Sequence, residues 1–367
     1  MRECRPVRVA LTLEQCWHEV PGGTATSILG LARALTARTD VDVVGVAARH
    51  EGPPPPPFRP AVPVHHLPLP RLALYEAWHG PGPLRWPPVE RATGAVDVVH
   101  ATAVAIPPSP RAPLVVTIHD LAFLAEPDAF TRHGLRFFRR GTALARRHAA
   151  LVLVPSEATA AECRAAGFDP DRMRVVPWGH DPDPATPDDV AAARARHGLP
   201  ERYGLFVGTL EPRKNLRRLV QAWGRAAGDV PLVVAGPTGW GDQELDPGPA
   251  TILPIGFVEP RERDALYAGA AVVAYPSLRE GFGLPVLEAM AQGAPVVTSA
   301  GTATAEVAGD AGVLVDPLDV GSIAEGVAAV LADPADLGAR GRARAATFTW
   351  AAAAERTVAA YREVTGG

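Results

Sequence analysis

Two glutamates, Glu280 and Glu288, stand eight positions apart on either side of a glycine-rich turn and a proline. The apolar run 271–277 before the turn is typical of a buried parallel strand. The run 285–293 after it predicts a helix with proline at its first position and glycine just past its end. The start of such a helix suits a phosphate, because its N–H groups are unpaired and partly positive. The two carboxylates would reach groups on either side of that phosphate. This layout fits a ligand with a sugar, a diphosphate and a ribose in a row.

Two adjacent cations form a second candidate site. Arg213 and Lys214 follow the predicted strand 204–208 and directly precede the predicted helix 216–224. At the end of a strand they could neutralise a diphosphate, and no acidic cluster accompanies them that would hold a metal ion instead. The alternative is a basic turn that only contacts solvent.

A pair of glycines, Gly22 and Gly23, forms a third candidate between the first predicted strand and the predicted helix 26–38. Glycine lets the backbone approach a ligand closely, and the helix start again favours an anion. A flexible turn is an equally good explanation. The segment lacks the G-x-G-x-x-G spacing of a dinucleotide-binding turn, and no P-loop motif occurs in the chain.

The fourth candidate, His119, follows the apolar run 114–118. Ligands of parallel α/β proteins bind beyond the carboxyl ends of the strands, where His119 is expected to lie. A buried histidine that only stabilises the fold is the alternative. Its neighbour Asp120 could cap the next turn or touch a substrate. His100 ends another predicted strand and has the same placement.

Composition narrows the class of protein. The net charge of −4 over 367 residues gives no reason to expect nucleic-acid binding. The cysteines, Cys4, Cys16 and Cys163, are too scattered for a zinc site and fit a reducing cytoplasm. The apolar run 7–13 is too short for a signal peptide, and no run approaches the roughly 20 residues that span a bilayer.

Short apolar runs alternate with helical patterns along the whole chain, which predicts a parallel α/β fold. The predicted strands of the first half are 7–13, 41–47, 62–67, 96–100, 114–118 and 151–154. Those of the second half are 204–208, 232–235, 252–255, 272–275, 295–298 and 312–315. Two similar sets indicate two doubly wound domains, which we place at residues 1–180 and 200–346, with 178–187 as a linker rich in proline, glycine and aspartate.

Together these segments resemble the retaining glycosyltransferases of family 4. The pair Glu280 and Glu288 is the most specific part of the match. The glycine pair, the strand that ends at His119, the segment 175–179 and the Arg213-Lys214 loop follow in the family's order. The resemblance implies the GT-B fold, in which two Rossmann-like domains face a cleft. It also implies that the last helix, within 347–367, crosses back onto the first domain.

The resemblance also implies a role for each matching residue toward a nucleotide-sugar donor. Glu288 would hold the ribose. Arg213 and Lys214 would hold the diphosphate. His119 would contact the donor sugar, and Glu280 would orient it, so both count as catalytic. Backbone N–H groups of four residues would also hold the diphosphate: Gly22, Gly23, Gly283 and Leu284. The base would lie against two residues, Phe257 and Val258.

Transfer in this family is thought to retain the anomeric configuration by departure and attack on one face of the sugar. No protein nucleophile is then required, and electrostatic stabilisation of the leaving diphosphate supplies much of the acceleration. We expect no cofactor and no metal ion, because the sequence offers no D-x-D pair beside a phosphate site. The chain departs from the family pattern at two positions. Thr209 replaces an early arginine of the cation loop, and Trp178 replaces an asparagine.

The acceptor half of the reaction has weaker signals. The segment 72–86 carries Tyr75, Trp78, His79 and Trp86, which suit a sugar or lipid but equally a protein core. The segment 131–148 holds arginines without any acidic residue: Arg132, Arg136, Arg139, Arg140, Arg146 and Arg147. It could bind an anionic membrane surface or an acceptor phosphate, or be only a solvated helix.

The sequence therefore predicts a retaining transferase that moves a hexose, with a lean toward mannose, to a hydroxyl of a glycan or lipid-linked acceptor. We expect it in the cytoplasm, at the inner membrane face if 131–148 binds lipid. Two alternatives stay open: a nucleotide-sugar epimerase with the same fold, and a nucleotide-sugar-binding protein without catalytic activity.

Overall fold

The computed structural model describes residues 5–18, 22–56, 58–80, 84–181, 183–237, 248–334 and 336–366. Cys4, which the sequence analysis considered, lies outside these ranges. The chain divides into two compact units. The first comprises Met1–Gly179 and Thr349–Gly367, and the second comprises His180–Phe348. The change of unit falls within the predicted linker, 178–187.

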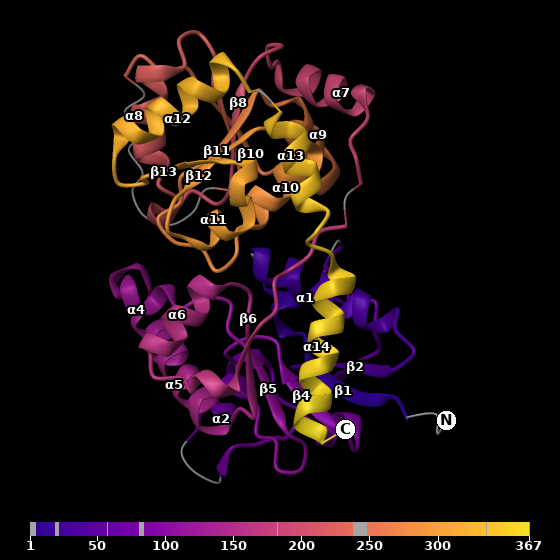
Figure 1. The fold of residues 1–367 in the computed structure, drawn as a ribbon. Helices are drawn as coiled ribbons and strands as arrows, with labels where there is room; N and C mark the ends of the chain where they lie inside the picture. Colours follow the sequence, from indigo (N-terminus) through magenta and orange to yellow (C-terminus); the bar gives the residue numbers. More distant parts are fainter. Residues whose placement is uncertain are drawn as a thin grey trace. The chain divides into compact units, whose positions relative to one another are not determined.

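The first unit is built on a parallel sheet in the order β3-β2-β1-β4-β5-β6-β7, counted over the described residues (Figure 1). Its strands are β1 (Val7–Thr12), β2 (Val41–Ala47), β3 (Val64–His66), β4 (Val98–Ala101), β5 (Leu114–Thr117), β6 (Leu151–Val154) and β7 (Met173–Val175). Its helices are α1 (Gly22–Thr36), α2 (Arg71–Trp78), α3 (Glu90–Thr93), α4 (Ala122–Ala125), α5 (Arg132–His148), α6 (Glu157–Ala165) and α14 (Trp350–Thr365). Short 3₁₀ turns are η1 (Glu14–Trp17), η3 (Pro127–Ala129) and η4 (Pro170–Arg172).

The second unit repeats the design with a parallel sheet in the order β10-β9-β8-β11-β12-β13, again counted over the described residues. Its strands are β8 (Gly204–Val207), β9 (Leu232–Ala235), β10 (Ile252–Gly256), β11 (Val272–Tyr275), β12 (Val296–Ser299) and β13 (Val313–Val315). Its helices are α7 (Pro187–His197), α8 (Leu216–Ala226), α9 (Pro260–Gly269), α10 (Leu284–Gln292), α11 (Ala303–Ala308), α12 (Val320–Ala332) and α13 (Leu337–Ala345). The 3₁₀ turns are η5 (Pro212–Lys214) and η6 (Gly309–Ala311).

The strands are continuous apolar runs because the sheet is covered on both faces. In β1 the buried residues alternate between two cores: Val9 and Leu11 join one cluster, and Ala10 joins the other. Every strand predicted from the sequence is present. The structure adds β7, whose short segment of mixed polarity, Met-Arg-Val, has no apolar run to predict it.

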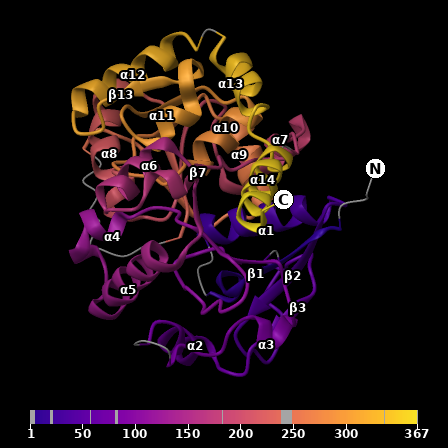
Figure 2. The same cartoon turned by 60° about the horizontal axis from the view of Figure 1, so that its bottom comes forward.

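Helix α14 returns to the first unit and packs along α1, as Figures 1 and 2 show. A Cβ atom on Gly30 would lie only 2.2 Å from the Trp350 ring, so glycine is needed for this close contact. Near the other end of α14, the buried Tyr361 hydroxyl bonds Nδ1 of the buried His100 in β4 at 2.7 Å. The last helix is therefore part of the core of the first unit.

Each sheet has one point where the strand order reverses direction. In the first unit it lies between β1 and β4, and in the second between β8 and β11. Loops that leave the carboxyl ends of the two strands at such a point run to opposite sides and leave a crevice that ligands commonly occupy. The loops after β8 and β11 carry the cation pair and the first glutamate, respectively.

We predict that Tyr361→Phe destabilises the first unit. The change leaves Nδ1 of His100 buried without its partner, which costs about 1–3 kcal/mol of unfolding free energy. Chemical denaturation followed by circular dichroism measures it. The control is Arg362→Ala on the same helix, which removes an exposed ion pair with Asp40 and should cost less than about 1 kcal/mol. Equal losses in the two variants would contradict the assignment of His100 as a stabilising core residue.

Candidate functional site

The first glutamate and one predicted cation form a buried ion pair at the reversal point of the second sheet. Lys214 ends η5 after β8, and Glu280 lies in the loop after β11. The Nζ atom of Lys214 is 2.6 Å from Oε1 of Glu280, and both side chains are only 9% exposed. The two loops are also tied together by their backbones, since the Leu278 N–H donates to the Arg213 carbonyl at 2.8 Å. Lys214 and Glu280 are far apart in the sequence, and they meet because β8 and β11 are neighbours in the sheet.

The carboxylate of Glu280 is almost fully used by donors. Its Oε1 accepts from Lys214, from the Tyr275 hydroxyl at 2.8 Å and from the Ser277 hydroxyl at 2.8 Å. Its Oε2 accepts from Arg213 at 3.1 Å. Burial raises the pKa of Glu280, but Lys214 and Arg213 outweigh burial and lower the pKa to about 2. Glu280 is therefore a charged, rigidly held acceptor at neutral pH.

Arg213 is shared between two carboxylates. Its guanidinium bonds Glu211 at 2.9 Å and Glu280 at 3.1 Å. Burial lowers the pKa of Lys214, which Glu280 only partly offsets. Two cations and two carboxylates balance within this cluster, so an added diphosphate needs further positive groups nearby.

The start of α10 supplies such a group. Gly283 caps the helix in the left-handed region with φ 112, and a Cβ atom there would lie 2.8 Å from the Thr304 side chain. The helix begins at Leu284, one residue earlier than predicted, because Gly283 takes the cap. Pro285 is therefore its second residue and not its first. Gly293 ends the helix with φ 80, as predicted. Pro285 has no N–H, and the N–H groups of Val286 and Leu287 donate to the Gly283 carbonyl. The start of α10 therefore offers an anion the N–H groups of Gly283 and Leu284 and the partial positive charge of the helix end.

The second glutamate, Glu288, lies one turn into α10 and is 5% exposed. Arg263 of α9 pairs with its Oε1 at 3.0 Å, and the Tyr267 hydroxyl donates to its Oε2 at 3.4 Å. Burial raises the pKa of Glu288, while Arg263 acts in the opposite direction. Each glutamate is thus held by a cation and a tyrosine, which fixes where its carboxylate can accept a ligand hydroxyl.

The residues predicted to contact the base differ in exposure. Phe257 follows β10 and its side chain is 66% exposed, so its ring is open to a stacking partner. Val258 is 8% exposed and belongs to the core. Of the two residues predicted to contact the base, only Phe257 therefore offers an exposed side chain.

In the first unit, the glycine pair lies inside α1 rather than before it. The helix begins at Gly22, whose φ of 59 favours glycine, and Gly23 is its second residue. The prediction of a turn before a helix at 26–38 was wrong in this respect, because the glycines let the helix start four residues earlier. Both residues are exposed, and the first turn carries no acidic side chain. The first-turn N–H groups remain suited to an anion.

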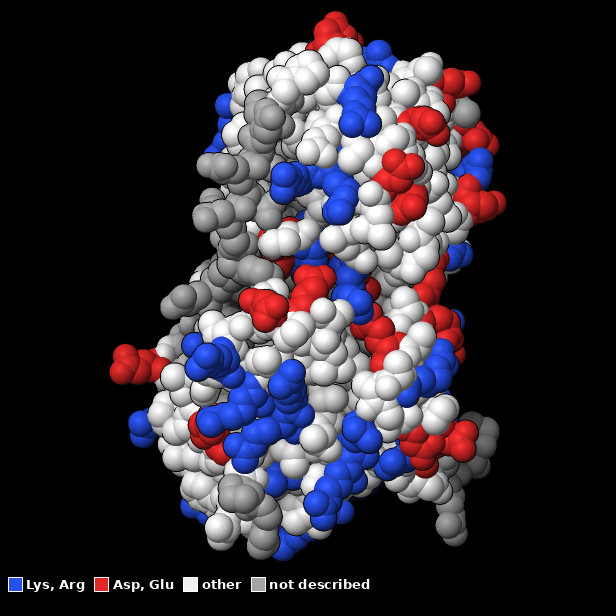
Figure 3. Space-filling view, turned by 90° about the vertical axis from the view of Figure 1, so that its left-hand side faces the viewer, with Lys and Arg blue, Asp and Glu red and all other residues white. Residues whose placement is uncertain are grey.

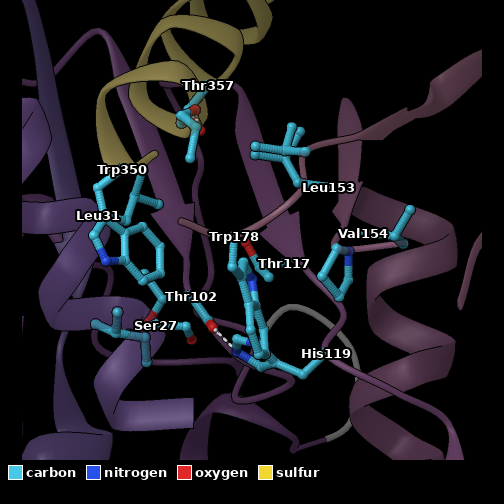
Figure 4. A pocket seen from close by; sticks show the side chains of 14 residues that line it. Ser27, Leu31, Thr102, Thr117, His119, Leu153, Val154, Trp178, Trp350 and Thr357 are labelled. Atoms are coloured by element: carbon cyan, nitrogen blue, oxygen red, sulfur yellow. Dashed lines mark hydrogen bonds between the residues drawn. The ribbon is translucent and has the colours of Figure 1, made fainter. Parts of the chain in front are cut away.

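His119 follows β5 and is partly buried (Figure 4). Its Nε2 lies 2.7 Å from the Thr102 carbonyl, so Nε2 carries the proton and Nδ1 is an acceptor. Burial lowers its pKa, which keeps the ring neutral. Nδ1 is buried and has no hydrogen-bond partner within the described residues. A ligand hydroxyl is the kind of group that Nδ1 could accept from.

The pocket in Figure 4 lies between the His119 ring, Trp178 and Trp350. The His119 and Trp178 rings are 5.3 Å apart. Its cavity volume is about 30 Å³, enough for roughly two water molecules and too small for a sugar ring. Trp178 therefore fills space beside His119.

Two residues considered with His119 have structural roles. His100 bonds Tyr361 and, at 2.8 Å, the Thr117 hydroxyl, and burial lowers its pKa to about 3. Asp120 accepts the Ala122 N–H at 3.0 Å and so caps the next turn. Both ring nitrogens of His100 are therefore engaged in the core, and one oxygen of Asp120 is engaged in the cap.

Sequence reasoning missed the partners of the two glutamates. Tyr275 lies within a run that predicted only a strand, and nothing in strand periodicity marks its hydroxyl. Arg263 and Tyr267 are four positions apart and so share a face of α9. The position of Arg263 on the same helix face as the buried Tyr267 is the signal that could have indicated a buried partner for a carboxylate.

The arginine-rich segment 131–148 forms α5, which Thr131 caps through the Gly134 N–H. Its inner face packs on the core: the Phe137 ring stacks on His79 at 4.5 Å and on Tyr75 at 5.1 Å. Its outer face exposes arginines, namely Arg132, Arg136, Arg139, Arg146 and Arg147. Figure 3 shows basic side chains gathered on this face of the first unit. Among the described residues, Arg136 on this face has an acidic partner in Glu76, at 3.5 Å.

The aromatic segment 72–86 mostly packs in the core. Trp78 is 1% exposed and His79 3% exposed, whereas Trp86 is 42% exposed. Residues 81–83 lie outside the described ranges. No helix in the described part of the chain is both long and apolar enough to cross a bilayer.

Two known protein families match the two halves of the chain. Residues 21–184 match the family model for glycosyltransferase family 4, and residues 201–333 match that for group 1 glycosyl transferases. The O-antigen chain mannosyltransferase B of Escherichia coli is 33% identical over 265 residues, 68% of this chain and 70% of that protein. A D-inositol 3-phosphate glycosyltransferase of Acidothermus cellulolyticus is 34% identical over 342 residues, 81% of this chain and 75% of that protein.

Solved structures agree on the fold. Anabaena HepE, crystallised with UDP and glucose, superimposes with a TM-score of 0.73 at 19% identity, covering 97% of this chain and 100% of that one. Two Rossmann-like units, each on a parallel sheet, are the elements of the GT-B fold. The chain therefore belongs to glycosyltransferase family 4 and is a glycosyltransferase with the GT-B fold.

Proposed function

We propose that the protein transfers a hexose from a nucleotide-diphosphate sugar to a hydroxyl of a glycan or lipid-linked acceptor, with retention of configuration and without a metal ion. The observation that carries this proposal is the buried pair of Lys214 and Glu280 at the reversal point of the second sheet. A cation for the diphosphate and a carboxylate for the sugar stand there side by side.

In the second unit the diphosphate is held by Lys214, by Arg213 and by the start of α10. Because the charges of Arg213 and Lys214 are already matched by Glu211 and Glu280, the N–H groups at Gly283–Leu284 add the further positive potential. These groups are fixed before the donor arrives. They stabilise the charge that grows on the leaving diphosphate, as a metal ion would in other transferases.

The donor's two ends are assigned to the two glutamates. Glu288 accepts from the ribose hydroxyls, and the exposed ring of Phe257 stacks on the base. Glu280 accepts from the sugar hydroxyls on the side away from the diphosphate.

Retention is assigned to departure and attack on the same face of the sugar. A double displacement would need a carboxylate free to attack the anomeric carbon. Glu280 is poorly suited to that, because four donors engage its oxygens and its pKa is lowered to about 2. The leaving diphosphate oxygen instead takes the acceptor's proton as the new bond forms.

For the transferred sugar we favour mannose, because the Escherichia coli relative is named as a mannosyltransferase. HepE was solved with UDP and glucose, which makes a UDP-hexose the second candidate. The epimerase and the inactive binding protein are the remaining alternatives. Both would bind a nucleotide sugar without transferring the hexose to an acceptor.

We also propose that the first unit binds an anionic membrane surface at the cytoplasmic face. The outer arginines of α5 supply positive charge. Exposed apolar side chains in the same unit supply contacts with lipid: Leu72 at 65%, Leu84 at 79%, Trp86 at 42% and Leu124 at 46%. This combination is what peripheral membrane binding requires.

The donor prediction is tested in two steps. Thermal shift against UDP-, GDP-, ADP- and dTDP-sugars should identify one donor class that raises Tm in a concentration-dependent way. Release of nucleoside diphosphate from that donor should then continue in EDTA and fall roughly 100-fold in Glu280→Gln and Lys214→Ala, as when one preorganised electrostatic group is removed. Unchanged kcat in both variants, or full loss in EDTA, would contradict the proposal. Donor binding without transfer to any acceptor hydroxyl would favour the inactive binding protein.

Glu288→Ala should raise the donor KM by roughly 10- to 100-fold, since a hydrogen bond to a charged group contributes about 1.5–3 kcal/mol. The ribose contacts exist in both the ground state and the transition state, so kcat should change less than KM. The control is Glu325→Ala, an exposed glutamate of α12. Circular dichroism checks the fold of both variants. A Glu288→Ala enzyme with the wild-type KM would remove Glu288 from the ribose site.

Membrane binding is tested by co-sedimentation with vesicles. The protein should bind phosphatidylglycerol vesicles at low salt and not phosphatidylcholine vesicles. Arg139→Glu with Arg147→Glu should weaken binding by at least roughly tenfold, because each basic residue contributes about 1 kcal/mol at such a surface. The same charge change at Arg217 and Arg225 of α8, both exposed, is the matched control. Failure to bind either vesicle, even at low salt, would rule out this surface.

A further inference from the structure

The side chain of Tyr275 lies at the centre of the proposed donor site although it can touch no solvent. It is the last residue of β11 and is 0% exposed. Its ring stacks on Phe206 with centroids 5.7 Å apart, and its backbone carbonyl accepts the Thr298 hydroxyl at 2.9 Å. The ring and backbone are therefore fixed by the core of the second unit. The hydroxyl bonds the charged residues, and Lys214 Nζ also lies 5.2 Å from the centroid of the ring.

The hydroxyl closes a triangle with the ion pair. Lys214 Nζ lies 2.5 Å from the Tyr275 oxygen, which in turn lies 2.8 Å from Oε1 of Glu280. The third side, from Lys214 to Glu280, is 2.6 Å. An ammonium group can only donate and a carboxylate can only accept. The tyrosine therefore accepts from Lys214 and donates its own proton to Glu280.

This triangle determines which atoms remain for a ligand. Lys214 has three N–H groups, and within the described residues two of them are directed at Tyr275 and Glu280. One N–H is left for a phosphate oxygen. On Glu280, three donors occupy Oε1, whereas among the described residues the one bond to Oε2 is the longer bond from Arg213. Oε2 is therefore the atom with room for a sugar hydroxyl.

We propose that Tyr275 is a positioning residue for sugar transfer, which directs one N–H of Lys214 to the donor diphosphate and Oε2 of Glu280 to the donor sugar. This inference rests on the function proposed above, and it assigns Tyr275 no contact with the substrate. Without the hydroxyl, the ammonium gains a second free N–H, and the carboxylate loses one of the donors that fix its orientation. The ion pair itself survives, so donor binding is kept.

The consequence is a separation of kcat from binding. Preorganised groups act mainly on the charge that develops as the diphosphate leaves, so a small change in direction weakens the transition state more than the ground state. Loss of the hydroxyl should therefore lower kcat and leave the donor KM nearly unchanged. A residue that only supported the fold would lower the fraction of active protein instead.

The test compares Tyr275→Phe with Tyr203→Phe in the full-length protein. Tyr203 is a matched control, because it is also 0% exposed in the second unit and its hydroxyl donates to a backbone carbonyl, that of Leu266, at 2.8 Å. Release of nucleoside diphosphate is measured with UDP-glucose and with GDP-mannose. Calorimetric titration with UDP and GDP gives the fraction of binding-competent protein, to which kcat is normalised. Glu280→Gln is measured in parallel.

We expect Tyr275→Phe to lose about tenfold in kcat, the scale of one hydrogen bond, with the donor KM within threefold of wild type. For Tyr203→Phe, kcat and the donor KM should both stay within twofold of wild type. A normalised kcat of Tyr275→Phe within twofold of wild type, while Glu280→Gln is strongly impaired, would overturn the role of Tyr275 and leave the proposed function intact. If Glu280→Gln is also unimpaired, the proposed site itself is wrong and this inference falls with it.

Discussion

The buried ion pair between Lys214 and Glu280 is the interaction on which the rest of the candidate site depends. Both side chains are 9% exposed. Burying two charges costs free energy unless further hydrogen bonds satisfy both groups. Here Tyr275 and Ser277 complete the carboxylate, and Arg213 pairs with its second oxygen. The parallel order that places β8 next to β11 makes this possible, because it brings two loops far apart in the chain to one edge.

The second glutamate is held on the same plan by different elements. Arg263 and Tyr267 of α9 pair with and donate to Glu288. Lys214 and Tyr275 hold Glu280 in the same way. Helix α10 connects the two systems, since its capped start follows Glu280 and its second turn begins near Glu288. A rigid helix start between two fixed carboxylates is well suited to a ligand whose phosphates lie between two hydroxylated rings.

Much of the fold could be read from the sequence, because buried parallel strands leave continuous apolar runs and a helix such as α10 is marked by its proline and glycine. Those patterns report burial and local geometry. They do not report which distant side chains meet, so the Tyr275 hydroxyl, the Arg263 pair and the second partner of Arg213, Glu211, were missed. The start of α1 at Gly22 was misplaced for a related reason: glycine permits both a turn and a helix start, and only the surrounding packing decides between them. Val258 was predicted to contact the base, because the sequence does not show that its side chain is buried.

The central claim is that one nucleotide-diphosphate sugar lies across both glutamates with its phosphates at Lys214. A crystal structure of the protein with bound UDP-glucose or GDP-mannose tests this most directly. The account predicts a diphosphate oxygen within hydrogen-bond distance of Lys214 Nζ, ribose hydroxyls on Glu288 and a sugar hydroxyl on Oε2 of Glu280. A donor bound with its diphosphate away from Lys214, or with the two glutamates still paired only to protein groups, would contradict it.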